Sequence, residues 1–202
     1  MYSFNHRRYL RTAILAATLA LLAACAPQPK FELNNVSGHL PDLQFNMTNG
    51  LDQPVTAASY RGKIVMMYFG YTHCPDVCPL TLAHMHQVLQ TIGRGAADVQ
   101  FIMVTVDPAR DTPEVLHKYV TTFDPRFVGL TGTQNQIAAL AKRYRVFYQR
   151  QAPKTPTGNY EVDHSSLIYI FDRQGHARLL AGPADPLTHI EHDLKLLVAE
   201  KA

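Results

Sequence analysis

The sequence predicts an α/β fold in which a central sheet carries helices on both of its faces. Short, continuous apolar runs at residues 64–69 and 99–106 are typical of strands that are buried on both faces. Segments with apolar residues at helical spacing, at residues 80–92 and 113–123, alternate with these strands. Buried strands that alternate with helices indicate a sheet covered on two sides.

The first residues have the features of an export signal. Three arginines precede an apolar run at residues 12–24, which is shorter than the roughly 20 residues needed to span a membrane. The run ends Leu-Ala-Ala before Cys25, which resembles the bacterial lipobox, whose cysteine is acylated and becomes the mature N-terminus. We expect a lipoprotein signal peptide at 1–24, lipidation of Cys25, a tether at 25–39 and a folded domain at 40–202. The alternative is an uncleaved anchor helix with an unmodified cysteine.

The charge of the chain is concentrated in this signal. The 202 residues carry a net charge of +3, and three of the 19 basic residues but none of the 16 acidic ones precede Cys25. The remaining chain is therefore neutral, which argues against nucleic acid as a partner. The hydrophobic fraction of 47% excludes a disordered protein.

The predicted domain opens with a hairpin. Asn49-Gly50 separates two strand-like segments, and both residues readily adopt the positive φ angles of a tight turn. The strand at 64–69 and the helix at 80–92 follow, and Gly93 ends that helix. After the second buried strand, Pro113 suits the first turn of the next helix.

The remaining elements alternate in the same way. We expect, in order, a strand at 127–130, a helix at 133–143, a strand at 146–149, a loop at 152–163, paired strands at 166–171 and 177–181, and a helix at 186–200. The loop is assigned from its content of Pro, Thr and Gly.

Cys74 and Cys78 form a Cys-x3-Cys motif between a buried strand and a helix. Cysteines at this spacing on a regular helix have Cβ atoms about 5–6 Å apart, whereas a disulfide requires about 3.8 Å. A metal ion held by both thiolates tolerates the wider spacing better. Pro75 keeps Cys74 off a regular helix, so a disulfide stays open as an alternative. Pro79 at the first helical position would put Cys78 at the N-cap, where unpaired N–H groups lower the thiol pKa.

Two thiolates alone make an incomplete metal site, so a histidine is the expected third ligand. His164 directly precedes the buried strand at 166–171 and is the strongest candidate. His73 adjoins the motif, whereas His84 and His86 are two residues apart on a helix and cannot share a face. We expect these three to be bystanders.

Asp107 and Arg110 follow the second buried strand, and ligand sites in such sheets lie at the carboxyl ends of the strands. The two residues therefore either support the metal site from outside the ligands or only brace their own loop. The sequence leaves both readings open.

Four segments, in order, closely resemble the Sco/SenC copper-binding proteins of cytochrome oxidase assembly. They are residues 70–79 (GYTHCPDVCP), 106–113 (VDPARDTP), 123–132 (FDPRFVGLTG) and 163–172 (DHSSLIYIFD). The resemblance implies a thioredoxin-like fold, with a central mixed sheet flanked by helices and an N-terminal hairpin. On this topology the strand after His164 is the neighbour of the cysteine loop.

The resemblance also implies a copper ion bound by Cys74, Cys78 and His164, with the two cysteines able to cycle to a disulfide. The implied function is a copper metallochaperone, and not a conventional enzyme, that supports assembly of the binuclear copper site of cytochrome c oxidase subunit II. The alternative is a thiol–disulfide reductase that keeps the cysteines of that site reduced. Many relatives have a transmembrane helix where this chain has a lipobox.

The partners implied are subunit II, other periplasmic copper chaperones or thiol reductants, and a membrane reached through the lipid anchor. The expected location is the bacterial cell envelope, facing the periplasm. Thiolates are soft ligands that select Cu(I), and imidazole binds both Cu(I) and Cu(II). The two cysteines and the histidine are therefore suitable ligands for copper.

Two other functions fit the motif less well. Metal-free oxidoreductases of the thioredoxin fold usually carry Cys-x2-Cys and a cis-proline before the facing strand, whereas residues 163–165 contain no proline. Peroxiredoxins place a proline before the reactive cysteine, and residues 64–73 contain none.

Overall fold

The computed structural model of the protein describes residues 30–152 and 160–200. The signal peptide predicted at 1–24 and the lipidation of Cys25 lie outside these residues. The described residues from Phe31 onward form one compact unit. Among the residues described, no helix combines the length and the apolar character that crossing a bilayer requires.

A mixed sheet forms the centre of this unit, as predicted. Its strands lie in the order β1-β10-β9-β4-β5-β6-β2-β3. They are β1 (Asn34–Asn35), β2 (Asn46–Asn49), β3 (Pro54–Thr56), β4 (Ile64–Gly70), β5 (Val99–Thr105), β6 (Val128–Thr131), β9 (Ile168–Phe171) and β10 (Ala177–Ala181). β4 pairs parallel with β5 and antiparallel with β9, so the strand that precedes the cysteine loop lies at the centre of the sheet.

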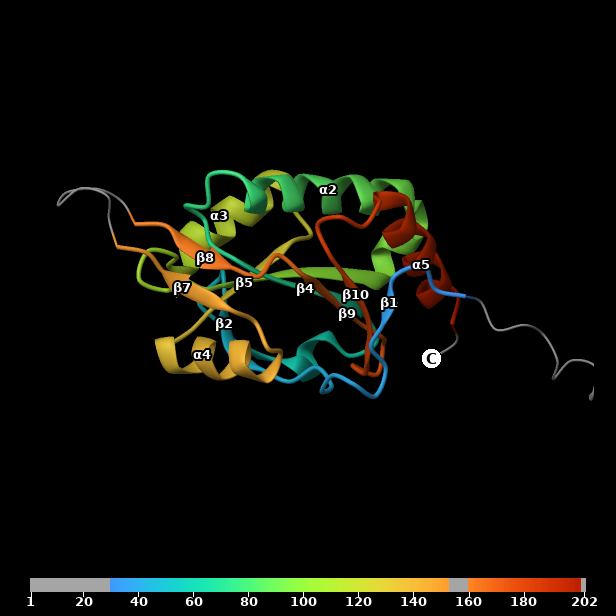
Figure 1. Ribbon diagram of the computed structural model, residues 1–202, viewed down its shortest axis with the longest axis horizontal. Helices are drawn as coiled ribbons and strands as arrows, with labels where there is room; N and C mark the ends of the chain where they lie inside the picture. Colours follow the sequence, from blue (N-terminus) through green and yellow to red (C-terminus); the bar gives the residue numbers. More distant parts are fainter. Residues whose placement is uncertain (1–29, 153–159, 201–202) are drawn as a thin grey trace, which may run out of the picture. The chain divides into compact units, whose positions relative to one another are not determined.

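Helices cover both faces of the sheet (Figure 1). They are α2 (Val77–Thr91), α3 (Pro113–Phe123), α4 (Gln134–Arg143) and α5 (Leu187–Ala199), with 3-10 turns η1 (Ala57–Tyr60) and η2 (Gly93–Asp98). α2 contacts both α3 and α5 on one face, and α4 lies on the opposite face (Figure 1). This two-sided cover explains why β4 and β5 read as continuous apolar runs.

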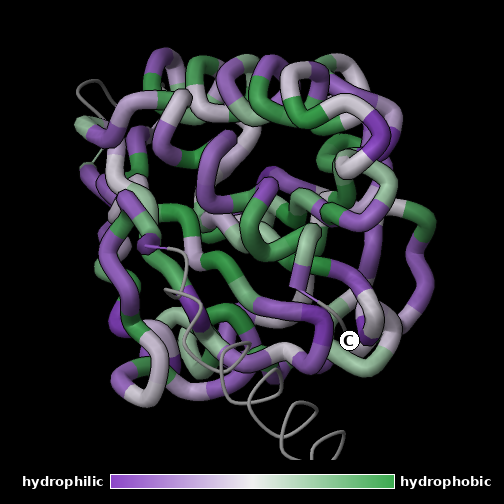
Figure 2. The backbone as a smooth tube through the Cα atoms, turned by 90° about the vertical axis from the view of Figure 1, so that its right-hand side faces the viewer, coloured by the Kyte–Doolittle hydropathy of each residue, from purple (hydrophilic) through white to green (hydrophobic). Residues whose placement is uncertain are grey.

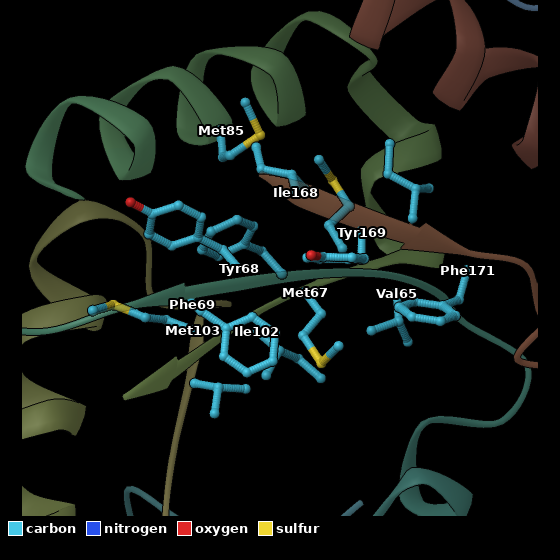
Figure 3. Packing of buried hydrophobic residues seen from close by; sticks show 14 of the residues in the cluster. Val65, Met67, Tyr68, Phe69, Met85, Ile102, Met103, Ile168, Tyr169 and Phe171 are labelled. Carbon is cyan, nitrogen blue, oxygen red and sulfur yellow. The ribbon is translucent and has the colours of Figure 1, made fainter. Parts of the chain in front are cut away.

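Side chains of β4 alternate between the two layers. Val65, Met67 and Phe69 point to one side of the strand, and Tyr68 points to the other side, toward Met85 of α2 (Figure 3). Every residue of β4 is buried. Hydrophobic positions accordingly run through the inner strands of the chain trace (Figure 2).

The predicted hairpin forms, but its turn differs from the expected one. β2 and β3 pair antiparallel, and residues 50–53 connect them. The positive φ falls on Asp52, at 57°, and not on Gly50. The side-chain oxygen of Asn49 accepts two backbone N–H groups of the turn at 3.0 Å. Gly50 is needed for space, because a Cβ there would lie 2.6 Å from the Cβ of His117.

The folded domain begins before residue 40. β1 pairs antiparallel with β10, and Leu33 is buried in the core. The backbone N–H groups of Glu32 and Leu33 donate to the buried Asp193 carboxylate of α5 at 3.0 and 2.8 Å. Residues 31–39, which the sequence assigned to the tether, therefore pack on the domain. A two-residue strand has no periodicity from which it could be predicted.

A second departure lies in the segment predicted as a loop at 152–163. β7 (Tyr148–Arg150) and β8 (Val162–His164) form a separate two-stranded antiparallel sheet. Tyr148 pairs with His164 in this register. The predicted loop thus ends in a strand, and the candidate ligand His164 is the last residue of that strand.

Candidate metal centre

The loop after β4 carries both cysteines into the start of α2. α2 begins at Val77, so Asp76 occupies the N-cap position and Cys78 is the second helical residue. The prediction that Cys78 is the N-cap is therefore wrong. The Cys78 N–H, one of the unpaired donors of the first turn, donates to the Cys74 sulfur at 3.4 Å. The sulfur that benefits from the helix start is thus that of Cys74.

The three sequence-predicted ligands meet at this point. The ligand atoms of Cys74, Cys78 and His164 lie within 4.8 Å of one another, and both cysteines are free thiols. Among residues 30–152 and 160–200, this is the only group of three or more His, Cys, Asp or Glu side chains close enough to share a metal ion. The cysteines are buried and His164 is half-buried, so the site is reached from one side.

The ring of His164 is oriented by its neighbours. Its Nδ1 lies 3.1 Å from the backbone oxygen of Ser165. Because a carbonyl oxygen can only accept, Nδ1 carries the proton, and the Nε2 lone pair faces the Cys78 sulfur at 3.3 Å. The rings of Tyr68 and Tyr71 meet the imidazole edge-on, with centroids 6.0 and 5.7 Å away. This arrangement presents the nitrogen that a metal would bind.

The two thiols are electrostatically different. The Cys78 thiol, together with the backbone N–H groups of Asp76 and Cys78, lowers the pKa of Cys74 to about 4. The proton shared with Cys74 and burial both raise the pKa of Cys78. At neutral pH the pair therefore contains one thiolate, on Cys74, and one thiol. The sequence-based expectation that the helix start lowers the pKa of Cys78 is therefore wrong, and the lowered pKa belongs to Cys74.

Two residues of β4 that the sequence argument missed shape the space around the Cys78 sulfur. The fully buried Tyr68 donates its hydroxyl proton to this sulfur at 3.4 Å. A Cβ on Gly70 would lie 2.9 Å from the same sulfur and 2.8 Å from Cε1 of Tyr68, so only glycine leaves room for both. The sequence signal was a tyrosine and a glycine at alternate positions in an apolar strand that leads into the motif.

A buried carboxylate fixes the loop before the cysteines. The Asp111 carboxylate accepts the Thr72 N–H at 3.1 Å, and the hydroxyls of Thr72 and Thr105 at 2.6 Å each. Burial raises the pKa of Asp111. These bonds join the cysteine loop to the end of β5, the neighbouring parallel strand.

Asp107 and Arg110 bond to the segment that carries His164 and not to the three candidate ligands. Arg110 pairs with Asp107, donates to the Tyr160 backbone oxygen at 3.0 Å, and stacks 3.6 Å from the centroid of the Tyr160 ring. The Tyr160 hydroxyl donates to Asp107 at 2.7 Å. The Arg110 guanidinium also lies 5.6 Å from the centroid of the Tyr71 ring, which packs on His164.

His73, His84 and His86 do not join this cluster. His73 is 45% exposed and hydrogen-bonds Thr72 at 3.0 Å. His86 pairs with Asp124 at 2.9 Å. His84 lines a small cavity between α2 and the loop after β10.

The donor set fits copper better than hard cations. Two sulfur donors and one imidazole nitrogen are soft or borderline ligands, and carboxylates that would attract Ca²⁺ or Mg²⁺ do not join the cluster. Three protein donors leave a coordination position open for an incoming ligand. The arrangement can therefore hold a soft metal ion and also release it by ligand exchange.

Comparison with known proteins agrees with this geometry. The SCO1/SenC family profile matches residues 37–199. An SCO2-like protein of Rickettsia prowazekii is 40% identical over 115 residues, which are 57% of this chain and 56% of the relative. The chain thus spans about half the length of the first curated relatives that it matches.

Two solved structures share the fold. Bradyrhizobium japonicum ScoI, solved with copper bound, is 38% identical with a TM-score of 0.69, over 76% of this chain and 97% of that one. An SCO1/SenC family lipoprotein of Bacillus anthracis is 26% identical with a TM-score of 0.66, over 83% of this chain and 99% of that one. The arrangement of the mixed sheet and its helices is therefore that of a thioredoxin-like fold, as expected.

Proposed function

Because the chain belongs to the SCO1/SenC family, we propose that it is a copper chaperone that holds the ion through Cys74, Cys78 and His164. It supports assembly of the binuclear copper site of cytochrome c oxidase subunit II. The observation that carries the proposal is the convergence of these three donors within 4.8 Å, from segments far apart in the chain. A relative solved with copper bound supports the proposal, since the match between the two chains extends over 97% of that relative.

Copper is the cargo in this proposal, and the chain must release it. His164 is half-buried and the cysteines are buried, so a partner's ligand approaches from the histidine side. The incoming sulfur or nitrogen occupies the open coordination position, and the bonds to the chain then break one at a time. Since His164 is the most exposed of the three ligand residues, it is the first to leave.

The second candidate is reduction of the cysteines in the oxidase copper site. The Cys74 thiolate favours this reductase function, because the thiolate is the attacking species in thiol–disulfide exchange. The nearby Cys78 would act as the resolving thiol. The described residues contain no cis peptide bond, so the cis-proline of thioredoxin-type reductases is absent from them. We therefore rank reduction as accessory to copper transfer.

Asp107 and Arg110 take the role of positioning residues in this function. Arg110 joins the loop after β5 to Tyr160 and, through Tyr71, to His164. The pair thus holds the histidine-bearing segment near the cysteines without touching the metal.

For the N-terminal region we propose a signal peptide at 1–24, lipidation of Cys25 and attachment to a membrane of the bacterial cell envelope. The copper domain, from Phe31 to the C-terminus, then faces the periplasm. The lipobox before Cys25 supports this, as does the likeness to a lipoprotein of the same family.

One experiment separates transfer from reduction. The copper-loaded chain is mixed with the reduced soluble domain of subunit II, and the copper-free reduced chain is mixed in parallel with the same domain in its disulfide form. We expect copper to move to the subunit II domain in the first mixture, which metal analysis of the two separated proteins measures. If the subunit II disulfide is reduced in the second mixture while no copper is transferred in the first, the chain is a reductase and not a copper chaperone.

A further inference from the structure

The hydroxyl of Tyr68 ends in the metal site, although the residue lies inside the core. Tyr68 is fully buried in β4, and its side chain lies on the α2 side of the sheet (Figure 3). Its O–H donates to the Cys78 sulfur at 3.4 Å. Cys78 is also fully buried, so solvent water does not replace this bond when it is broken.

The value of this hydrogen bond depends on the state of the sulfur. A thiol polarised toward a neighbouring thiolate, or a sulfur bound to a metal, carries electron density that the phenol can bond. A disulfide sulfur is a much weaker acceptor, and it must also move toward its partner. Oxidation therefore takes the sulfur acceptor away from a buried hydroxyl, whose other polar neighbour is the Thr81 side chain, and this loss is unfavourable.

We propose that Tyr68 is a positioning residue that holds the Cys74–Cys78 pair in its reduced, copper-ready form. The inference deepens the proposed copper function, because a disulfide would remove both sulfur ligands. Hydrogen bonds to a cysteine ligand also tune metal sites, so the same contact acts on the copper-bound state.

The equilibrium that Tyr68 biases is exchange with glutathione disulfide. Two electrons pass from the Cys74 thiolate and the Cys78 thiol to glutathione disulfide; the Cys78 proton and one proton from the buffer protonate the two glutathione sulfurs. The Cys74–Cys78 bond forms, the glutathione S–S bond breaks, and two molecules of reduced glutathione are released. The equilibrium constant of this reaction measures the preference for the reduced pair.

The test is this constant in Tyr68→Phe, which removes one oxygen and keeps the ring. The copper-free full chain is equilibrated in glutathione buffers, and its oxidised fraction is measured by alkylation and mass spectrometry. We expect the constant for oxidation to rise about tenfold, which equals roughly 30 mV. An unchanged constant would overturn the inference.

Tyr169→Phe is the matched control. Tyr169 is also a buried tyrosine of the sheet, but its hydroxyl donates to the backbone oxygen of Tyr144 at 2.9 Å. The control loses one buried hydroxyl and one hydrogen bond without touching a sulfur. Its oxidation constant should equal that of the wild type. An equal rise in both variants would assign the effect to general loosening of the core and overturn the inference.

A strengthened donor gives a test of opposite sign. Site-specific replacement of Tyr68 by 3-fluorotyrosine makes the phenol more acidic, and this should lower the oxidation constant below that of the wild type. This measurement still tests the role of Tyr68 if Tyr68→Phe does not fold, since an oxidation constant that is unchanged or raised contradicts the inference.

Copper titration of the reduced wild type is run separately. Its failure would reject the proposed copper function, while the glutathione measurements still decide the role of Tyr68.

Discussion

Nε2 of His164 lies 3.3 Å from the sulfur of Cys78, although 86 residues separate the two in the chain. Two separate structures create this contact. β4 delivers the cysteine loop at the centre of the sheet, and the β7–β8 pair together with β9 brings His164 back to it. Changes on either side should therefore weaken the metal site, and they should do so in distinguishable ways.

Gly70→Ala should damage the cysteine side. The added Cβ would lie 2.9 Å from the Cys78 sulfur and 2.8 Å from Tyr68, so one of them must shift. Overpacking of this kind costs about 1–3 kcal/mol of unfolding free energy, and we expect about tenfold weaker Cu(I) binding. Urea unfolding and competition with a Cu(I) chelator measure the two effects.

Gly95→Ala is the control for this change, because its Cβ would meet only Val198, at 3.4 Å. It should leave Cu(I) affinity unchanged. If Gly70→Ala binds Cu(I) as tightly as the wild type, the added Cβ does not displace the Cys78 sulfur, and the prediction is contradicted.

The low pKa of Cys74 predicts an unusual pH profile for alkylation. With a pKa of about 4, Cys74 is already a thiolate at mildly acidic pH. The rate of its reaction with iodoacetamide should be nearly constant between about pH 5 and 7, whereas an ordinary thiol of pKa about 8.5 gains about tenfold per pH unit. Mass spectrometry of the copper-free reduced chain assigns the labelled residue. A tenfold gain per unit at Cys74 would contradict the assigned thiolate.

Arg110→Met should damage the histidine side. The variant keeps the bulk of the side chain but loses the bond to the Tyr160 backbone oxygen and the contact of the cation with its ring. We expect copper to transfer to a chelator about fivefold faster, corresponding to roughly 1 kcal/mol. Stopped-flow absorbance measures the rate.

Arg143→Met provides the comparison, since Arg143 also lies over a tyrosine, 5.8 Å from the centroid of the Tyr144 ring. Its transfer rate should match that of the wild type. If the two variants release copper at the same rate, Arg110 only braces its own loop.

Asp193→Ala tests where the domain begins. The buried Asp193 carboxylate accepts the backbone N–H groups of Glu32 and Leu33, at 3.0 and 2.8 Å. Loss of this acceptor should lower the unfolding free energy by about 1–3 kcal/mol and speed hydrogen exchange in residues 31–36. Cu(I) affinity should not change. Unaltered exchange in that segment would mean that the tether extends further into the chain.

The order of the large elements follows from the sequence because each has a strong local signal. β4 and β5 are continuous apolar runs, and α3 starts at Pro113 after the N-cap Thr112, whose hydroxyl accepts the Val115 N–H. The weak elements lack such signals. β1 and β8 have two and three residues, too few for a period to be read.

The ligands could be named from the motif, but their environment could not. α2 starts two residues earlier than predicted, which gives the helix start to Cys74 in place of Cys78, and this depends on how the loop leaves β4. The contact of Tyr68 with the Cys78 sulfur depends on the side of the strand that faces α2. Both follow from tertiary packing, which no local pattern encodes.

Cu(I) titration of the reduced full chain tests the central claim most directly. We expect the wild type to bind one copper ion tightly, Cys74→Ser and Cys78→Ser to lose more than about a hundredfold in affinity, and His164→Ala about tenfold or more. His84→Ala, which changes a histidine outside the cluster, should bind as the wild type does. Equal binding by the wild type, Cys74→Ser and His164→Ala would contradict the assigned site.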